Sequence, residues 1–176
     1  MSWTERLRIE IGWDRPRENV DWTAVESLLG LALPGSYKDY AEAFGWGEFN
    51  GAIEVFGAVG DISHGGIVGE SKKRSELADL DQEFESMYAP YSVFPNPGGL
   101  MIWGVTGRGD SLFWETRGEI SERWPIVAIT EDGRSFSYGM EVSEFLYGCV
   151  VSGDIRPFSA VSRGYASGFM PIESYE

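Results

Sequence analysis

Residues 95–124 read PNPGGLMIWGVTGRGDSLFWETRGEISERW, and this stretch says most about the fold. Its opening Pro-Asn-Pro-Gly-Gly predicts a stiff turn, and two apolar runs follow, at 100–105 and 112–114. A glycine-rich turn at 106–110 joins the runs, and this arrangement is typical of a β-hairpin. The stretch carries three tryptophans but no metal, phosphate or nucleotide motif. It therefore predicts a shaped aromatic sheet and not a reaction centre.

A second hairpin is expected directly after the first. Strands over 125–130 and 135–138 flank a turn at 131–134, in which Asp132-Gly133 is a strong hairpin signal. Further upstream, the expected non-helical segments are a strand at 53–59 and glycine-rich loops at 45–51 and 61–69.

Two helices are expected before these strands. Asp21 can cap the first, over 22–29, and Gly30 can end it. The second begins at Leu33-Pro34 and stops at Gly45, because proline suits the first helical turn and glycine a helix end. Its apolar stripe comprises Tyr37, Tyr40, Ala41 and Phe44.

Two more helices are expected later in the chain. The first runs over 71–87 with an acidic outer face, and the last begins at a Ser143 cap. The predicted buried stripes are Leu77, Leu80, Phe84 and Met87 in the former, and Phe145, Leu146, Cys149 and Val150 in the latter.

The order of these elements indicates an α+β fold. Helices come first and adjacent hairpins later, which favours a mainly antiparallel sheet of about five or six strands with helices packed against it. At 176 residues, 43% of them apolar, the chain suits a single domain over 1–176 with a sizeable core. We expect that core at about 20–153, followed by an irregular C-terminal tail.

The charge balance limits the partners. The net charge is −14, from 28 acidic and 14 basic residues. Nucleic acids and anionic membranes are disfavoured, because both are bound by basic surfaces, whereas a basic protein would be attracted. The alternative is that the acidity only maintains solubility. The N-terminus mixes both charge signs, unlike a signal peptide, and no apolar run is long enough to approach a membrane span. Cys149 is the single cysteine of the sequence, so no internal disulfide can form. We therefore expect a cytoplasmic location.

Catalytic patterns are few. Gly109-Asp110-Ser111-Leu112 has the letters of the GDSL esterase motif, and Asp61-Ile-Ser-His64 resembles that family's Asp-x-x-His element. The two elements occur in the reverse order, so we interpret Gly109 and Asp110 as turn residues. His64 is expected in an exposed loop and Cys149 in the core. A single histidine and a single cysteine exclude the usual zinc sites in a monomer, and we expect no metal, cofactor or catalytic residue.

Several motifs resemble the SUKH superfamily, which includes the yeast cell-wall-assembly regulator. Its pattern is a Trp and a Glu on an early helix, then Leu-Pro, a Tyr and a glycine-rich turn. In this chain the corresponding residues are Trp22, Glu26, Leu33-Pro34, Tyr37 and Gly45-Trp46-Gly47, followed by Pro97-Gly98-Gly99-Leu100, Trp103-Gly104, Gly109-Asp110, Phe113-Trp114, Trp124-Pro125 and Glu144-Phe145-Leu146. The similarity covers about residues 20–153.

The resemblance implies an α+β fold and no catalysis. Most bacterial members resemble immunity proteins of polymorphic toxin systems, which bind a cognate toxin domain, often a nuclease, and block it. A regulatory scaffold like the cell-wall regulators is the alternative, and a serine hydrolase is a remote one. Candidate protein-binding residues are Trp46, Glu48, Asp79, Asp81, Glu83 and Glu85. Trp46 could equally pack over the end of the second helix, whereas Trp103 and Trp114 are expected in the core.

Overall fold

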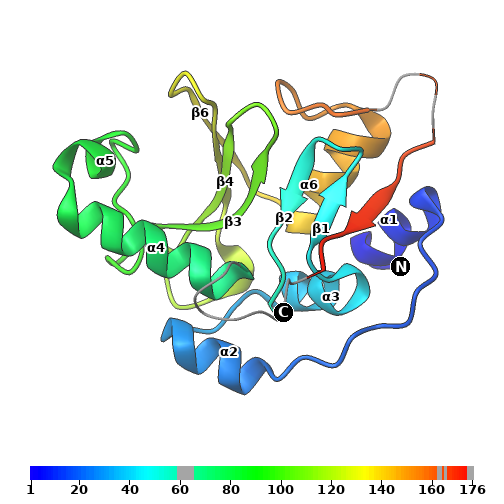
Figure 1. Cartoon of the computed structure of the whole chain (residues 1–176), viewed down its shortest axis with the longest axis horizontal. Coiled ribbons are helices and arrows are strands. Elements are labelled where there is room, and N and C mark those ends of the chain that lie inside the picture. The colour runs from blue at the N-terminus through cyan, green and yellow to red at the C-terminus, as the bar shows by residue number, and fades with distance from the viewer. Residues whose placement is uncertain (59–65, 162–163, 165, 174–176) are drawn as a thin grey trace.

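A computed structural model describes residues 1–58, 66–161, 164 and 166–173, and a seven-stranded antiparallel sheet lies at its centre (Figure 1). The strand order is β6-β5-β4-β3-β2-β1-β7. The strands are β1 (Gly47–Phe49), β2 (Ile53–Val55), β3 (Leu100–Thr106), β4 (Ser111–Glu115), β5 (Ile126–Ile129), β6 (Ser135–Tyr138) and β7 (Phe169–Pro171). The predicted α+β class is confirmed, with more strands than expected.

Six α-helices pack around this sheet in the described part of the chain. They are α1 (Trp3–Ile11), α2 (Trp22–Leu29), α3 (Gly35–Phe44), α4 (Gly66–Leu80), α5 (Gln82–Ser86) and α6 (Val142–Tyr147), with a 3₁₀ turn η1 (Ser121–Arg123) and a π-helical turn η2 (Gly148–Ser152). Figure 1 shows α4 crossing the sheet and running out beyond it, to the side opposite α1.

Both predicted hairpins are present as β3–β4 and β5–β6. In the first turn, the Thr106 hydroxyl donates to Asp110 Oδ2 at 2.7 Å, and Gly109 adopts a positive φ of 93°. Gly109 and Asp110 are therefore turn residues, as interpreted. Nearly every residue of β3 and β5 is buried, so the central strands are covered on both faces. This double coverage explains why their sequences are continuous apolar runs and do not alternate.

Aromatic side chains cover the two faces of the central hairpin. On one face Tyr37 of α3 meets Trp114 edge-on, with ring centroids 5.1 Å apart, and Phe145 of α6 meets Trp103 at 5.8 Å. On the other face Tyr88 packs edge-on against Phe113 at 5.2 Å. Trp103 and Trp114 are both buried, which confirms their predicted place in the core.

The two early helices form as predicted. The Asp21 carboxylate accepts from the backbone N–H of Ala24 at 3.1 Å, and Gly30 ends α2 with a φ of 75°. All four apolar residues predicted for α3 are buried. Its N-terminus has no side-chain cap of its own. The carboxylate of Glu122, far along the chain, accepts there from the backbone N–H groups of Gly35 and Ser36.

Three elements were missed by the sequence analysis. The α1 helix has a capping residue, Ser2, which accepts from Glu5 N, and a left-handed Gly12 at its end. Strand β1 lies in the predicted loop 45–51, and its turn into β2 has Asn50 and Gly51 at positive φ, so Asn-Gly was a usable hairpin signal. Strand β7 lies in the predicted irregular tail and carries no local signal. The predicted strand 53–59 ends at Val55, and residues 59–65 lie outside the description.

The buried stripe predicted for 71–87 is wrong. The helix divides at Asp81 into α4 and α5, and Leu77, Leu80 and Met87 are exposed, while only Phe84 is partly buried. The side chains of α4 that are buried belong to its first two turns, and in its last turn only Ala78 packs, partly buried, against the core. The predicted Ser143 cap is also wrong, since Glu141 occupies the cap position of α6 and Ser143 is buried.

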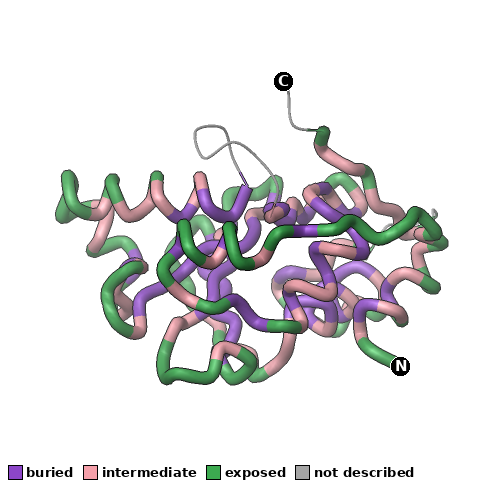
Figure 2. The backbone as a smooth tube through the Cα atoms, turned by 90° about the horizontal axis from the view of Figure 1, so that it is seen from below, coloured by how far each residue is buried: buried purple, intermediate pink, exposed green. Residues whose placement is uncertain are grey.

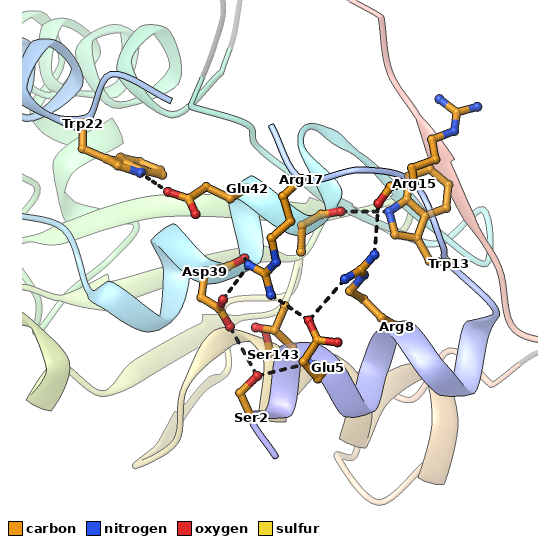
Figure 3. A network of polar contacts seen from close by, with 12 residues as sticks. Ser2, Glu5, Arg8, Trp13, Arg15, Arg17, Trp22, Asp39, Glu42 and Ser143 are labelled. Carbon is orange, nitrogen blue, oxygen red and sulfur yellow. Dashed lines mark hydrogen bonds and ion pairs between the residues drawn. The ribbon is translucent and has the colours of Figure 1, made fainter. Parts of the chain in front are cut away.

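Polar contacts attach α1 to the rest of the domain (Figure 3). Arg17 donates to Glu5 Oε1 of α1 and to Asp39 Oδ1 of α3, both at 2.7 Å. The hydrogen bond from Arg17 is the main reason why the pKa of the Glu5 carboxyl lies below its ordinary value. The buried hydroxyls of Thr4 and Ser143 lie 2.9 Å apart, which joins α1 to α6.

Tyr37 and Tyr40 provide a matched test of this core. Both side chains are fully buried, but only the Tyr37 hydroxyl has a partner, donating to the Phe56 carbonyl at 2.6 Å, whereas the Tyr40 hydroxyl has none among the described residues. Tyr37→Phe should lower the free energy of unfolding by about 1–3 kcal/mol, because it leaves a buried carbonyl unpaired. Tyr40→Phe should leave it unchanged or raise it, because it removes an unpaired buried hydroxyl. Urea unfolding of both variants measures the difference, and equal losses would contradict the assignment.

Candidate functional site

The predicted protein-binding residues lie in two separate regions. Trp46 and Glu48 lie beside β2 and β7, whereas the four other carboxylates lie around the junction of α4 and α5, at the opposite end of the molecule (Figure 1). We call the first region the β1 face, comprising Trp46, Glu48, Glu54 and Met170, and the second the acidic arm, residues 76–87. The two regions do not form one continuous site.

The β1 face is organised by strand pairing. Glu48 lies directly opposite Glu54 on one side and Met170 on the other, so these three side chains share one face of the sheet. The Trp46 indole N–H donates to Glu54 Oε1 at 2.8 Å. Glu54 therefore already has an internal partner, and Glu48 faces a second carboxylate across the strands.

Trp46 is half-buried. Its side chain is held close to Gly57, where an added Cβ would lie 2.7 Å from the Trp46 Cβ, and its carbonyl accepts from Ile172 N at 2.9 Å. It also lines a cavity of about 310 Å³ together with Phe44 and Val20. Trp46 thus packs against Gly57 and lines a cavity that Phe44, at the end of α3, also lines.

The acidic arm begins where α4 leaves the sheet. Ile67 and Val68, near the start of α4, are buried, and the Ile67 N–H donates to the Gly57 carbonyl at 2.9 Å. The outer turns then project away from the sheet, and their surface is mostly exposed or half-exposed (Figure 2). Leu80 is 85% exposed, which is the highest fraction of any large apolar side chain in the described residues. Met87 is 64% exposed and Leu77 is 38% exposed.

The arm is nevertheless tied to the domain. Asp81 ends α4 and caps α5, accepting from the Glu83 N–H at 2.8 Å. Phe84, partly buried, packs edge-on against Tyr88 with ring centroids 5.5 Å apart, and Tyr88 packs on Phe113 of the central sheet. The return of the chain to the sheet therefore holds α5 in place, while Leu77, Leu80 and Met87 remain exposed.

The charge of the arm is uniform. Its twelve residues contain five carboxylates and no basic side chain: Glu76, Asp79, Asp81, Glu83 and Glu85. Asp79, Asp81 and Glu83 are exposed and Glu85 is half-exposed. None of the ion pairs found within the described ranges involves these five carboxylates. The arm thus offers carboxylates outside the described ion pairs next to exposed apolar side chains, and the basic residues Lys72, Lys73 and Arg74 precede it on α4.

Polar residues of the family-like pattern are used inside the fold. Trp22 donates to Glu42 Oε1 at 2.7 Å, and Glu26 accepts from the Leu33 N–H at 2.8 Å and pairs with Lys38. Asp110 is buried in the β3–β4 turn, as described above. These contacts position helices and turns within the fold.

The residues of the hydrolase hypothesis are only partly described. Ser111 lies at the start of β4, between Val105 of β3 and Ile129 of β5. Asp61 and His64 lie outside the described residues. Cys149 is fully buried, as predicted, and burial raises the pKa of its thiol. The described ranges contain no cluster of His, Cys, Asp and Glu suited to a metal ion, and no helix with the length and apolarity of a membrane span.

Comparison with known proteins identifies the family. A profile of the SUKH_6 family, described as SMI1-KNR4 cell-wall, matches residues 19–146. No curated protein and no solved structure matches the chain significantly. The matched range begins just before α2 and ends within α6, which leaves α1 and β7 outside it. Because this range covers well over half of the chain, the protein belongs to the SUKH_6 family.

Proposed function

We propose that this protein is a non-enzymatic immunity protein that binds a cognate toxin, a basic nuclease domain, in the cytoplasm and neutralises it. The observation that carries the proposal is a division among its polar residues. Trp22, Glu26 and Asp110 of the family-like pattern are bonded within the fold, whereas the carboxylates of the acidic arm are exposed and outside every described ion pair. A protein built in this way acts by binding through its surface.

The charge of the chain supports a basic partner. A nuclease binds phosphate through a cleft lined with basic side chains. A chain with a net charge of −14 is attracted to such a cleft and can exclude the nucleic acid from it. Electrostatic attraction mainly accelerates association, which matters when one free toxin molecule can damage the cell.

The family description favours a second candidate. Because it names the cell wall, a regulatory scaffold that binds ordinary cellular proteins is the alternative function. The two functions differ in their genetic consequences. A scaffold would alter growth or the cell wall of a pure culture when its gene is deleted, whereas an immunity protein would matter only where its toxin is present.

The proposal predicts protection from a toxin encoded next to the gene. Co-expression of this chain with that toxin domain should restore growth, and the two proteins should co-purify. A toxin from an unrelated system serves as the control and should remain active. Ser111→Ala should protect as well as the unmodified chain, because no bond-making step is involved. Failure to bind or protect against any neighbouring toxin would refute the immunity role, and loss of protection in Ser111→Ala would favour a hydrolase.

The proposal also predicts that association depends on salt. Raising the ionic strength from about 0.01 M to about 0.15 M shortens the Debye length from roughly 30 Å to roughly 8 Å. The association rate constant with the toxin should therefore fall by about tenfold or more, while dissociation changes less. Surface plasmon resonance at several salt concentrations measures both rates. An association rate that does not depend on salt would show that the acidic surface does not accelerate association.

A further inference from the structure

We infer that the acidic arm is the docking element of this protein, and that it inserts Leu77, Leu80 and Met87 into an apolar pocket whose rim carries Lys and Arg side chains of a partner protein. The inference rests on the proposed function only for the identity of that partner, which would be the toxin. It deepens that function by stating which surface binds and what chemistry the opposite surface must have.

These three apolar side chains are exposed on a segment that is held in place. Leu77 and Leu80 are three residues apart in α4, so they share one side of the helix. Phe84 and Tyr88 attach the same segment to the sheet, so the exposure of the two leucines and Met87 does not result from a detached helix. Exposed apolar side chains that lie together, as Leu77 and Leu80 do on α4, mark protein–protein contacts when they form part of a larger patch.

Acidic residues accompany these apolar side chains along the arm. Five carboxylates lie within the same twelve residues as the three apolar side chains, with no base among them. This charge repels nucleic acids and anionic lipids, and it favours a protein surface that carries Lys and Arg. An apolar centre with a charged border is also the usual anatomy of a protein interface. The observations together select a basic protein with an apolar pocket as the occupant.

The β1 face is the rival surface, and it fits a partner less well. Glu54 already accepts from the Trp46 indole, and Glu48 lies opposite Glu54. Met170 is 61% exposed, but it is the only large apolar side chain of this face with that degree of exposure. The β1 face therefore serves as the internal comparison in the experiment.

The first test uses paired substitutions in the full-length chain and the toxin domain encoded next to the gene as the probe. Leu80→Gln/Met87→Gln should weaken binding by roughly tenfold or more through faster dissociation, because it removes the buried centre of the contact but no charge. Asp79→Asn/Asp81→Asn/Glu83→Gln/Glu85→Gln should instead slow association and flatten its salt dependence. Asparagine at position 81 keeps the capping hydrogen bond of α5.

The matched control is Ile9→Gln/Met170→Gln. These side chains are 62% and 61% exposed, close to the 64% of Met87, and they lie on α1 and on the β1 face. The control should bind as tightly as the unmodified chain. Since all of these positions are on the surface, urea unfolding should show that every variant is folded. If the control pair weakened binding to the toxin domain and the arm variants did not, the inference would be overturned while the proposed function would remain intact.

The second test locates the contact directly by photo-crosslinking. Cys149 is fully buried, so a cysteine introduced at position 80, 87, 9 or 170 can be labelled alone with a benzophenone maleimide. The unmodified chain should take up the label only after denaturation, which is the control for this step. Probes at positions 80 and 87 should crosslink to the toxin domain, and probes at 9 and 170 should not. The inference would be overturned if only the probes at positions 9 or 170 crosslinked, or if a complex formed and no probe crosslinked.

The outcome remains decisive if no toxin binds. In that case the proposed function has failed, and the same labelled proteins are mixed with a lysate of the native cells. The docking role of the arm would be supported, with a different partner, if an identified basic protein crosslinks from positions 80 and 87 but not from 9 and 170. Its capture must also be lost in Leu77→Gln/Leu80→Gln. The absence of such a protein would overturn the docking role of the arm.

Discussion

The structure depends on the burial of one helical stripe of aromatic side chains against the sheet. Along α3, Tyr37, Tyr40 and Phe44 stack in sequence, with ring centroids 6.2 Å and 5.2 Å apart. Tyr37 contacts Trp114 of the central hairpin edge-on and bonds the carbonyl of Phe56, while Phe44 meets Phe49 of β1. One helix therefore sets the position of both the central and the lateral strands. A change in its orientation would disturb each of these contacts.

The covering of both sheet faces has a consequence for function. Because helices and aromatic side chains enclose β3, β4 and β5, the centre of the sheet offers no surface to a partner. The proposed binding surfaces lie at the periphery, where the acidic arm projects on one side and the β1 face lies on the other (Figure 1). Trp22, Glu26 and Asp110 of the family-like pattern are bonded within the body of the fold, whereas the arm carries exposed carboxylates and apolar side chains.

Local chemistry explains which elements could be predicted. The two hairpins and helices α2 and α3 were predicted because turn and capping residues act within a few positions, as Asp21, Gly30 and Asp132-Gly133 do. Helix α1 and strand β1 had usable signals in Ser2, Gly12 and Asn50-Gly51 that were overlooked. Strand β7 had none, because its place at the sheet edge depends on pairing with β1 across more than a hundred residues. The Glu122 cap of α3 depends on a similarly distant contact.

For the candidate site, too, the properties set by nearby residues could be predicted, and those set by distant contacts could not. The sequence by itself determined the fold class, the excess of acidic residues, the aromatic centre and the acidic character of 79–85, because composition and short-range patterns carry these properties. It also predicted that Leu77, Leu80 and Met87 would be buried, since apolar spacing on a helix does not reveal whether anything lies opposite. Only the tertiary structure decided that α4 leaves the sheet after its first turns, so that these side chains meet solvent. Burial is a property of how elements are arranged around one another, and no single segment contains that arrangement.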